Sequence, residues 1–246
     1  MDKSLYISMS GANQNMVAMG IHANNLANVN TTGFRADFQQ ARAMPVFGET
    51  HPTRVYSMTE RPGTEFAPGS LVETGRDLDI AVSGDGFIAV QALDGSEAYT
   101  RGGNLEVDVN GVLRTGNGLP VLGNGAPISI PPAQNITIGI DGTITIRDLG
   151  GSADSLAAID RIKLVKPEAG ALYKGEDGLL RTRDGAELPA DASIRVNSGF
   201  LEGSNVNAIS ALTEIIELSR QFEMHIKMMR NAEENSEATA RLLQFS

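Results

Sequence analysis

The sequence contains no cysteine and no tryptophan, and it has only 3 histidines in 246 residues. Without cysteine the chain can form no disulfide, no thiol nucleophile and no Cys-ligated zinc site, and the absence fits either redox compartment. His22, His51 and His225 are far apart, and none has a second histidine or a paired carboxylate at ligand spacing. We therefore expect no catalytic residue, no metal site and no cofactor.

Positive charge and long apolar runs are also scarce. The 20 Lys and Arg against 30 Asp and Glu give a formal net charge of −10. A surface that neutralises phosphates is usually basic, so we expect no nucleic-acid partner. Residues 4–34 carry no charge, but their asparagines and hydroxyl side chains do not fit a membrane span or the apolar part of a signal peptide. We expect neither direct membrane insertion nor a cleaved signal.

What the sequence does have is a long apolar row at helical spacing near its C-terminus. No Pro or Gly occurs after Gly203, and charged residues occupy the opposite face. Ser204, Asn205 or Asn207 can cap the first turn. The row predicts a helix of roughly ten turns that needs a partner. Its members are Leu212, Ile215, Leu218, Phe222, Ile226 and Met229.

A second row lies near the N-terminus, where apolar residues recur at alternating steps of four and three. This heptad spacing predicts a helix that closes near Gly33 and packs against the C-terminal one in a coiled-coil-like stem. Side-chain amides near its end can bind the last carbonyls or another chain. The row is Leu5, Met9, Ala12, Met16, Met19, Ala23 and Leu26, and the amides are Asn24, Asn25 and Asn28.

The middle of the chain alternates short apolar runs with Asn-Gly and Asp-Gly pairs, which suit tight hairpin turns. The strand candidates are 79–82, 87–90, 105–109, 128–130, 136–140, 143–146, 162–165 and about 193–200. The fold class is therefore α+β, with an antiparallel all-β domain inserted between two terminal helices. The expected divisions are 1–33 (helix), 34–76 (extended connector, with strand pieces near 55–58), 77–200 (β domain) and 201–246 (helix).

The residue pattern alone allows more than one function. The terminal helices favour assembly with other subunits over a private hairpin, because the first helix has no charged outer face. A soluble binding module or hydrolase would instead need a pocket in which Asp77, Asp79 and Asp85 converge. Residues 106–117 imitate a calcium loop, but the twelfth position is Asn117 rather than Glu, and a strand followed by a turn explains the same residues.

Several segments resemble the bacterial flagellar axial family of rod, hook and hook-associated proteins. Residues 23–35 read ANNLANVNTTGFR, and 199–207 read GFLEGSNVN. Between them, 84–87 (GDGF), 99–104 (YTRGGN) and 111–115 (GVLRT) are similar to pieces of the family's β domain. The opening residues, 220–224 (RQFEM) and the modest length are most similar to a proximal-rod member. A distal-rod member is the alternative, although it usually carries Trp where this chain has Tyr6.

This resemblance implies a structural subunit and no enzyme. Its implied partners are other rod proteins, copies of itself and the flagellar type III export apparatus, which takes subunits without a cleaved signal. It implies assembly in the periplasm into a hollow helical rod that transmits torque, with terminal helices as the inner tube and β domains outside. Head-to-tail contacts that do not close into a ring build such a tube.

Overall fold

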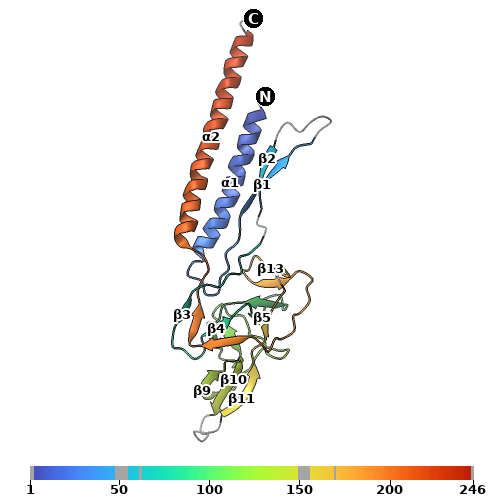
Figure 1. The fold of residues 1–246 in the computed structure, drawn as a ribbon, viewed down its shortest axis with the longest axis vertical. Coiled ribbons are helices and arrows are strands. Elements are labelled where there is room, and N and C mark those ends of the chain that lie inside the picture. Colours follow the sequence, from blue (N-terminus) through green and yellow to red (C-terminus); the bar gives the residue numbers. More distant parts are fainter. Residues whose placement is uncertain (1–2, 48–54, 61–62, 149–155, 169, 245–246) are drawn as a thin grey trace. The chain divides into compact units, whose positions relative to one another are not determined.

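The computed structural model describes residues 3–47, 55–60, 63–148, 156–168 and 170–244 (Figure 1). By its internal contacts the chain divides into two units. The helical unit comprises Met1–Asn28, Ala36–Glu65 and Val206–Ser246, and the β unit comprises Val29–Arg35 and Phe66–Asn205. The predicted α+β class with antiparallel strands is confirmed.

Two helices dominate the helical unit, α1 (Lys3–Ala27) and α2 (Ala208–Gln244). Near the end of α1, the Asn28 side chain donates a hydrogen bond of 2.9 Å to the carbonyl of Asn24. Of the predicted caps for α2, Asn207 fills the position: its Oδ1 accepts from the backbone N–H groups of Ile209 (3.0 Å) and Ser210 (3.2 Å). Asn207 thus binds backbone N–H groups that have no intrahelical acceptor in the first turn of α2, and the Asn28 amide gives a second donor to a carbonyl in the last turn of α1.

The two helices lie side by side and run antiparallel (Figure 1). Gly11 of α1 contacts His225 of α2. Closer to the N-terminus of α1, Leu5 lines a cavity together with Ala232 and Ser236. Rising residue numbers on one helix thus match falling numbers on the other.

A hairpin completes the helical unit. It consists of β1 (Gln40–Pro45) and β2 (Val55–Glu60), paired antiparallel. Thr59 joins β2 to α1, because its backbone N–H donates to Gln14 Oε1 (2.6 Å) and its hydroxyl to the Gln14 carbonyl (3.3 Å). The predicted connector 34–76 thus holds this hairpin and β3 (Leu71–Glu73).

The β unit is built from small antiparallel sheets. The largest has the order β12-β5-β6-β14-β13, a second has the order β11-β10-β9, and three pairs are β15-β4, β16-β3 and β7-β8. The strands are β4 (Ile80–Ser83), β5 (Phe87–Gln91), β6 (Glu97–Thr100), β7 (Leu105–Val107), β8 (Leu113–Thr115), β9 (Ala133–Ile138), β10 (Thr143–Asp148), β11 (Leu156–Arg161), β12 (Leu164–Val165), β13 (Leu172–Lys174), β14 (Leu180–Thr182), β15 (Arg195–Ser198) and β16 (Phe200–Glu202).

Strand β5 is buried on both faces, and successive residues therefore enter different hydrophobic clusters. Ile88 and Val90 join the larger cluster, with Leu105, Leu113, Ile128, Ile144 and Ile162 among its fully buried members. Phe87 and Ala89 join the smaller cluster with Tyr99, Val165, Leu172 and Leu180. An unbroken apolar run such as Phe87–Val90 is thus a strand placed between two cores.

Strands β6, β8, β11, β13 and β14 were not among the predicted runs. Some of the predicted runs and turns also differ from the structure. Residues 128–130 make only an isolated bridge, between Ser129 and Val112. The predicted strand 193–200 is two strands, β15 and β16, because Gly199 takes φ +81° between them. At Asp85-Gly86 the positive φ lies on Gly84, two residues before the glycine of the pair, whereas the other predicted Asn-Gly and Asp-Gly turns have it on their own glycine.

Candidate assembly interface

The helix α1 turns small and polar residues inward and large apolar residues outward. Its buried positions are Ser8, Gly11, Ala12, Ala18 and Asn25. Its exposed large apolar side chains are Tyr6, Ile7, Met9, Met16 and Val17, and Met16 is the most open of them at 59%. The face that packs within the chain is therefore the less apolar one.

The predicted row on α1 is divided between these faces. Ala12 is buried, Leu5, Met19 and Leu26 are half-buried, and Met9, Met16 and Ala23 are exposed. Of the predicted amides, Asn25 is buried, Asn28 is half-buried and Asn24 is exposed. The structure thus does not bring the whole row against α2.

The predicted row on α2 faces α1 more consistently. Leu218 is buried, and Ile215, Phe222, Ile226 and Met229 are half-buried, whereas Leu212 is exposed. Ala211, His225 and Ala232 also turn inward, and the pattern had not identified them as interface residues. Ile209, Leu212, Ile216, Met224 and Met228 remain outside.

These outward side chains form what we call the outer apolar faces of α1 and α2. Removing the exposed half of one such side chain from water is worth about 1 kcal/mol. Ten of them, five on each helix, leave a surface that is unusually apolar for a helix pair in water. Such a surface is typical of a protein that binds further chains through its helices.

Asn25 ties α1 to the segment that enters the hairpin. Its Nδ2 donates to the Asp37 carbonyl and its Oδ1 accepts from the Asp37 N–H, both at 2.9 Å. Asp37 also forms a bridge with Thr64 on the returning strand. The amide therefore completes the backbone hydrogen bonding of a buried residue.

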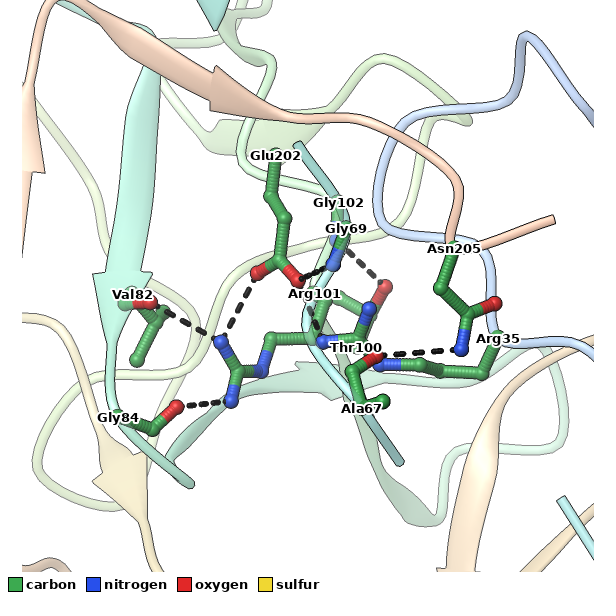
Figure 2. Close-up of polar contacts among 10 residues, drawn as sticks. All are labelled: Arg35, Ala67, Gly69, Val82, Gly84, Thr100, Arg101, Gly102, Glu202 and Asn205. Carbon is green, nitrogen blue, oxygen red and sulfur yellow. Dashed lines mark hydrogen bonds and ion pairs between the residues drawn. The ribbon is translucent and has the colours of Figure 1, made fainter. Parts of the chain in front are cut away.

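The β unit contains a buried ion cluster that the sequence reasoning missed (Figure 2). Glu202 is its centre: its carboxylate oxygens lie 2.5 Å from Arg35 NH2 and 2.9 Å from Arg101 NH1. The three side chains are 1–3% exposed. We call these residues the Arg–Glu–Arg cluster.

Backbone groups complete the cluster. The Gly69 N–H donates to Glu202 Oε1 at 2.9 Å, and Arg101 donates to the carbonyls of Val82 (3.0 Å) and Gly84. Burial lowers the pKa of Arg101, and the charge of Glu202 opposes that shift. A buried arginine remains protonated near neutral pH even so.

Close backbone approach requires glycine beside the cluster. The Gly33 N–H donates to the Glu202 carbonyl at 2.8 Å, and a Cβ on Gly33 would lie 2.3 Å from the carbonyl carbon of Arg101. Gly33 also has φ +69°, a conformation that favours glycine. The segments 33–35, 99–104 and 199–203, each part of a motif noted in the sequence, thus meet at one point.

A cavity of about 540 Å³ lies next to Arg101, with Phe66, Phe87 and Leu172 among its apolar lining residues. Of the three carboxylates that a hydrolase would need to converge, only Asp85 lines it. Asp79 is buried, with an oxygen 3.5 Å from Arg76 NH1, and Asp77 is exposed. The cavity lining therefore lacks the predicted catalytic arrangement.

Among the described residues, no group of three or more His, Asp or Glu side chains is placed to hold a metal ion. In the calcium-like segment, Asp108 binds Arg114 at 3.1 Å and the Val109 N–H at 2.6 Å. Neither helix, within its described part, is long and apolar enough to cross a bilayer.

Comparison with protein families gives three matches along the chain. Residues 5–35 match "Flagella basal body rod protein", and residues 81–146 match "Flagellar hook protein FlgE/F/G D1 domain". Residues 197–242 match "Flagellar basal body rod FlgEFG protein C-terminal". These matches include Arg35 and Arg101, Glu202, and almost all of both helices.

Individual relatives agree over the full length. The chain is 42% identical to the flagellar basal-body rod protein FlgF of Escherichia coli strain K12 and to that of Salmonella typhimurium strain LT2, with 100% of each chain covered. It is 33% identical to the flagellar basal-body rod protein FlgG of Bacillus subtilis strain 168, covering 94% of this chain and 96% of the relative.

Proposed function

Because this chain belongs to the flagellar basal-body rod protein family, with FlgF proteins among its full-length relatives, we propose that it builds the proximal rod by packing its terminal helices against those of neighbouring subunits. It is a structural protein of the flagellum and not an enzyme. The 42% identity to the FlgF proteins of Escherichia coli and Salmonella typhimurium, against 33% to the FlgG of Bacillus subtilis, supports the proximal over the distal position.

The outer apolar faces of α1 and α2 carry this proposal. Their methionines, leucine, isoleucines, valine and tyrosine are 39–78% exposed in the described chain. Neighbouring helices would bury them in a continuous seam, and contacts repeated without closure would extend the assembly into a helical tube. Residues 4–34 contain no Asp, Glu, Lys or Arg, so packing α1 against several neighbours would bury no charged side chain.

In this proposal residues 1–33 and 201–246 are the assembling segments, arranged as a coiled-coil-like stem, 34–76 is the connector and 77–200 is the β domain. The residues predicted from spacing divide their roles. Leu218, Phe222 and Met229 support the helix pair, whereas Met9, Met16 and Leu212 meet neighbours. Copies of this chain and other rod proteins are the partners, reached in the periplasm after export through the flagellar type III apparatus without a cleaved signal.

One leucine substitution at two positions tests the proposal. Leu212 is half-exposed on the outer face of α2, and Leu93 is 98% exposed in a β-unit turn. In a strain whose own copy of the gene is deleted, L212D should abolish swimming and rod completion, because each subunit contact would bury a carboxylate. L93D should swim normally. Equal swimming of the two variants at equal protein levels would rule out this role for α2.

A further inference from the structure

Each helix carries a row of buried or half-buried residues spaced seven apart, and the two rows include the contact between Gly11 and His225. On α1 the row is Gly11, Ala18 and Asn25, all buried. On α2 it is Ala211, Leu218, His225 and Ala232, of which all but the half-buried His225 are buried. Seven-residue spacing keeps each row on one side of its helix. The same spacing allows the helices to pair in more than one register.

Gly11 and His225 are a contacting pair whose side chains differ greatly in size. A Cβ atom on Gly11 would lie 2.5 Å from Cε1 and 2.7 Å from Nε2 of the imidazole, closer than real Cβ atoms approach other atoms. Gly11 therefore serves as the hole into which His225 fits. The other glycine of α1, Gly20, is exposed, and a Cβ there would meet nothing within 4 Å.

A slip of one heptad is the main competing arrangement of such a pair. It moves the helices by about 10.5 Å and brings the same rows together again. His225 would then face Ala18 or, for a slip in the other direction, Ser4. Both residues have a Cβ atom, whereas Gly11 has none and so leaves space for the imidazole. The buried Nδ1 of His225 has no hydrogen-bond partner among the described residues, so the ring contributes to the helix pair through its volume.

We propose that Gly11 and His225 form a register lock between the terminal helices. Both are positioning residues: they select the one pairing in which the outer apolar faces of α1 and α2 are correctly aligned. The importance of that alignment rests on the proposed assembly function. The lock itself is a property of the single chain and is tested separately.

The chain offers a matched pair of glycines for the test. G11A and G20A add the same methyl group to the same helix, and only G11A fills the hole. The natural absence of cysteine allows clean cross-linking of the purified full-length chain. Cysteines at Leu5 and Ser236, which line one cavity, report the native register. Cysteines at Leu5 and Met229 report the pair slipped by seven residues.

We expect G11A to lower the cross-link yield between 5 and 236 by roughly tenfold relative to G20A, because the His225 imidazole would have to leave its position to admit the methyl group. Removing the ring as well, in G11A/H225A, should restore the yield. Swimming of the variants without added cysteines should follow the same order. This recovery separates a register effect from general damage to α1.

Three results would overturn the lock. The first is equal cross-linking in G11A and G20A, and the second is a G11A defect that persists in G11A/H225A. The third is a parent chain that cross-links through 229 rather than 236. If the lock is upheld in the purified chain while L212D still swims, the proposed assembly role fails and the lock stands.

Discussion

At the scale of single residues, the Arg–Glu–Arg cluster places two guanidinium groups and one carboxylate where water barely reaches them. Glu202 contacts both arginines, and its own backbone carbonyl binds the Gly33 N–H. A buried pair adds little net stability against apolar substitutes, but losing one partner leaves an uncompensated buried charge. The cluster should therefore be sensitive to removal of Glu202 above all.

We predict that Glu202→Ala lowers the free energy of unfolding of the β unit by about 3–5 kcal/mol, because both arginines lose their contacting acid. Urea unfolding of the full chain, followed by the β-sheet signal in circular dichroism, measures this. The control is Glu237→Ala, which removes an exposed pair with Arg241. That change should cost less than about 0.5 kcal/mol. Equal losses in the two variants would contradict the prediction.

Tyr99 gives a second residue-scale prediction. Its hydroxyl donates to Glu97 (2.8 Å) and accepts from the Leu188 N–H (2.9 Å), and Glu97 in turn binds Lys163 (2.7 Å). At neutral pH, Tyr99→Phe should lower the free energy of unfolding by about 1–2 kcal/mol, since the Leu188 N–H loses its hydrogen-bond acceptor.

The same tyrosine predicts an alkaline dependence. Burial, followed by hydrogen bonding and charge from Glu97, raises the pKa of Tyr99 well above its ordinary value. The unfolded chain ionises this tyrosine near pH 10 while the folded chain resists, so the wild type loses stability as pH rises past about 10. The difference in free energy of unfolding between the wild type and Y99F, measured by urea titration, should therefore become smaller from pH 8 to pH 11. A constant difference would show that Tyr99 does not titrate differently on folding.

At the scale of elements, Asn24 and Asn25 are adjacent but differ in burial and in what their side chains bind. Asn25→Ala removes both hydrogen bonds to the Asp37 backbone and should destabilise the end of α1 by about 1–3 kcal/mol. Asn24→Ala, at the exposed neighbour, should be nearly neutral. Thermal loss of helical circular dichroism compares the two variants. If N24A melts as early as N25A, the anchoring of α1 through Asn25 is not supported.

The same helix shows what spacing can and cannot predict. Apolar periodicity correctly indicated a helix in 3–27, but it cannot say which face is used within the chain. In α1 the buried positions are Ser8, Gly11, Ala12, Ala18 and Asn25, and these small or polar residues contribute little to an apolar pattern. In α2 the intrachain face does contain the predicted leucine and phenylalanine, because Leu218 and Phe222 pack inward.

The Arg–Glu–Arg cluster could not be predicted from the sequence for a different reason. Arg35 and Glu202 are 167 residues apart, and no local pattern connects them. Each stands in a segment that had been noted only for its resemblance to a family. Most turns and about half of the β-unit strands followed from Asn-Gly or Asp-Gly pairs and from alternation, since these are local properties, whereas β6, β8, β11, β13 and β14 were not predicted. Which segments meet in space depends on topology, which local spacing does not encode.

At the scale of the whole molecule, the two units are held by different means. Both hydrophobic clusters of the described structure lie entirely within the β unit. The helical unit has no such cluster among its described residues, and its buried apolar side chains are mostly alanines, at positions 12, 18, 211 and 232, together with Leu218. Because burial of apolar surface is the main favourable contribution to folding, the helical unit should be the less stable of the two in a free subunit.

Amide hydrogen exchange on the purified chain measures this difference. Peptides from 5–26 should exchange faster than those from β5 and β6, because local opening of the helix pair exposes little apolar surface. Inclusion in an assembled rod should slow exchange in 5–26 and leave β5 almost unchanged. Equal protection of both segments in the free chain would mean that the helix pair is already stable alone.

The position of Glu202 also affects the timing of folding. Every group that its carboxylate binds comes from earlier in the chain, at residues 35, 69 and 101, so the acid is synthesised after all its partners. A nascent or truncated polypeptide that ends before residue 202 holds two arginines without the acid that contacts them both, and it should be digested readily by protease. The β unit can thus complete its buried ion contacts only after residue 202 has been synthesised.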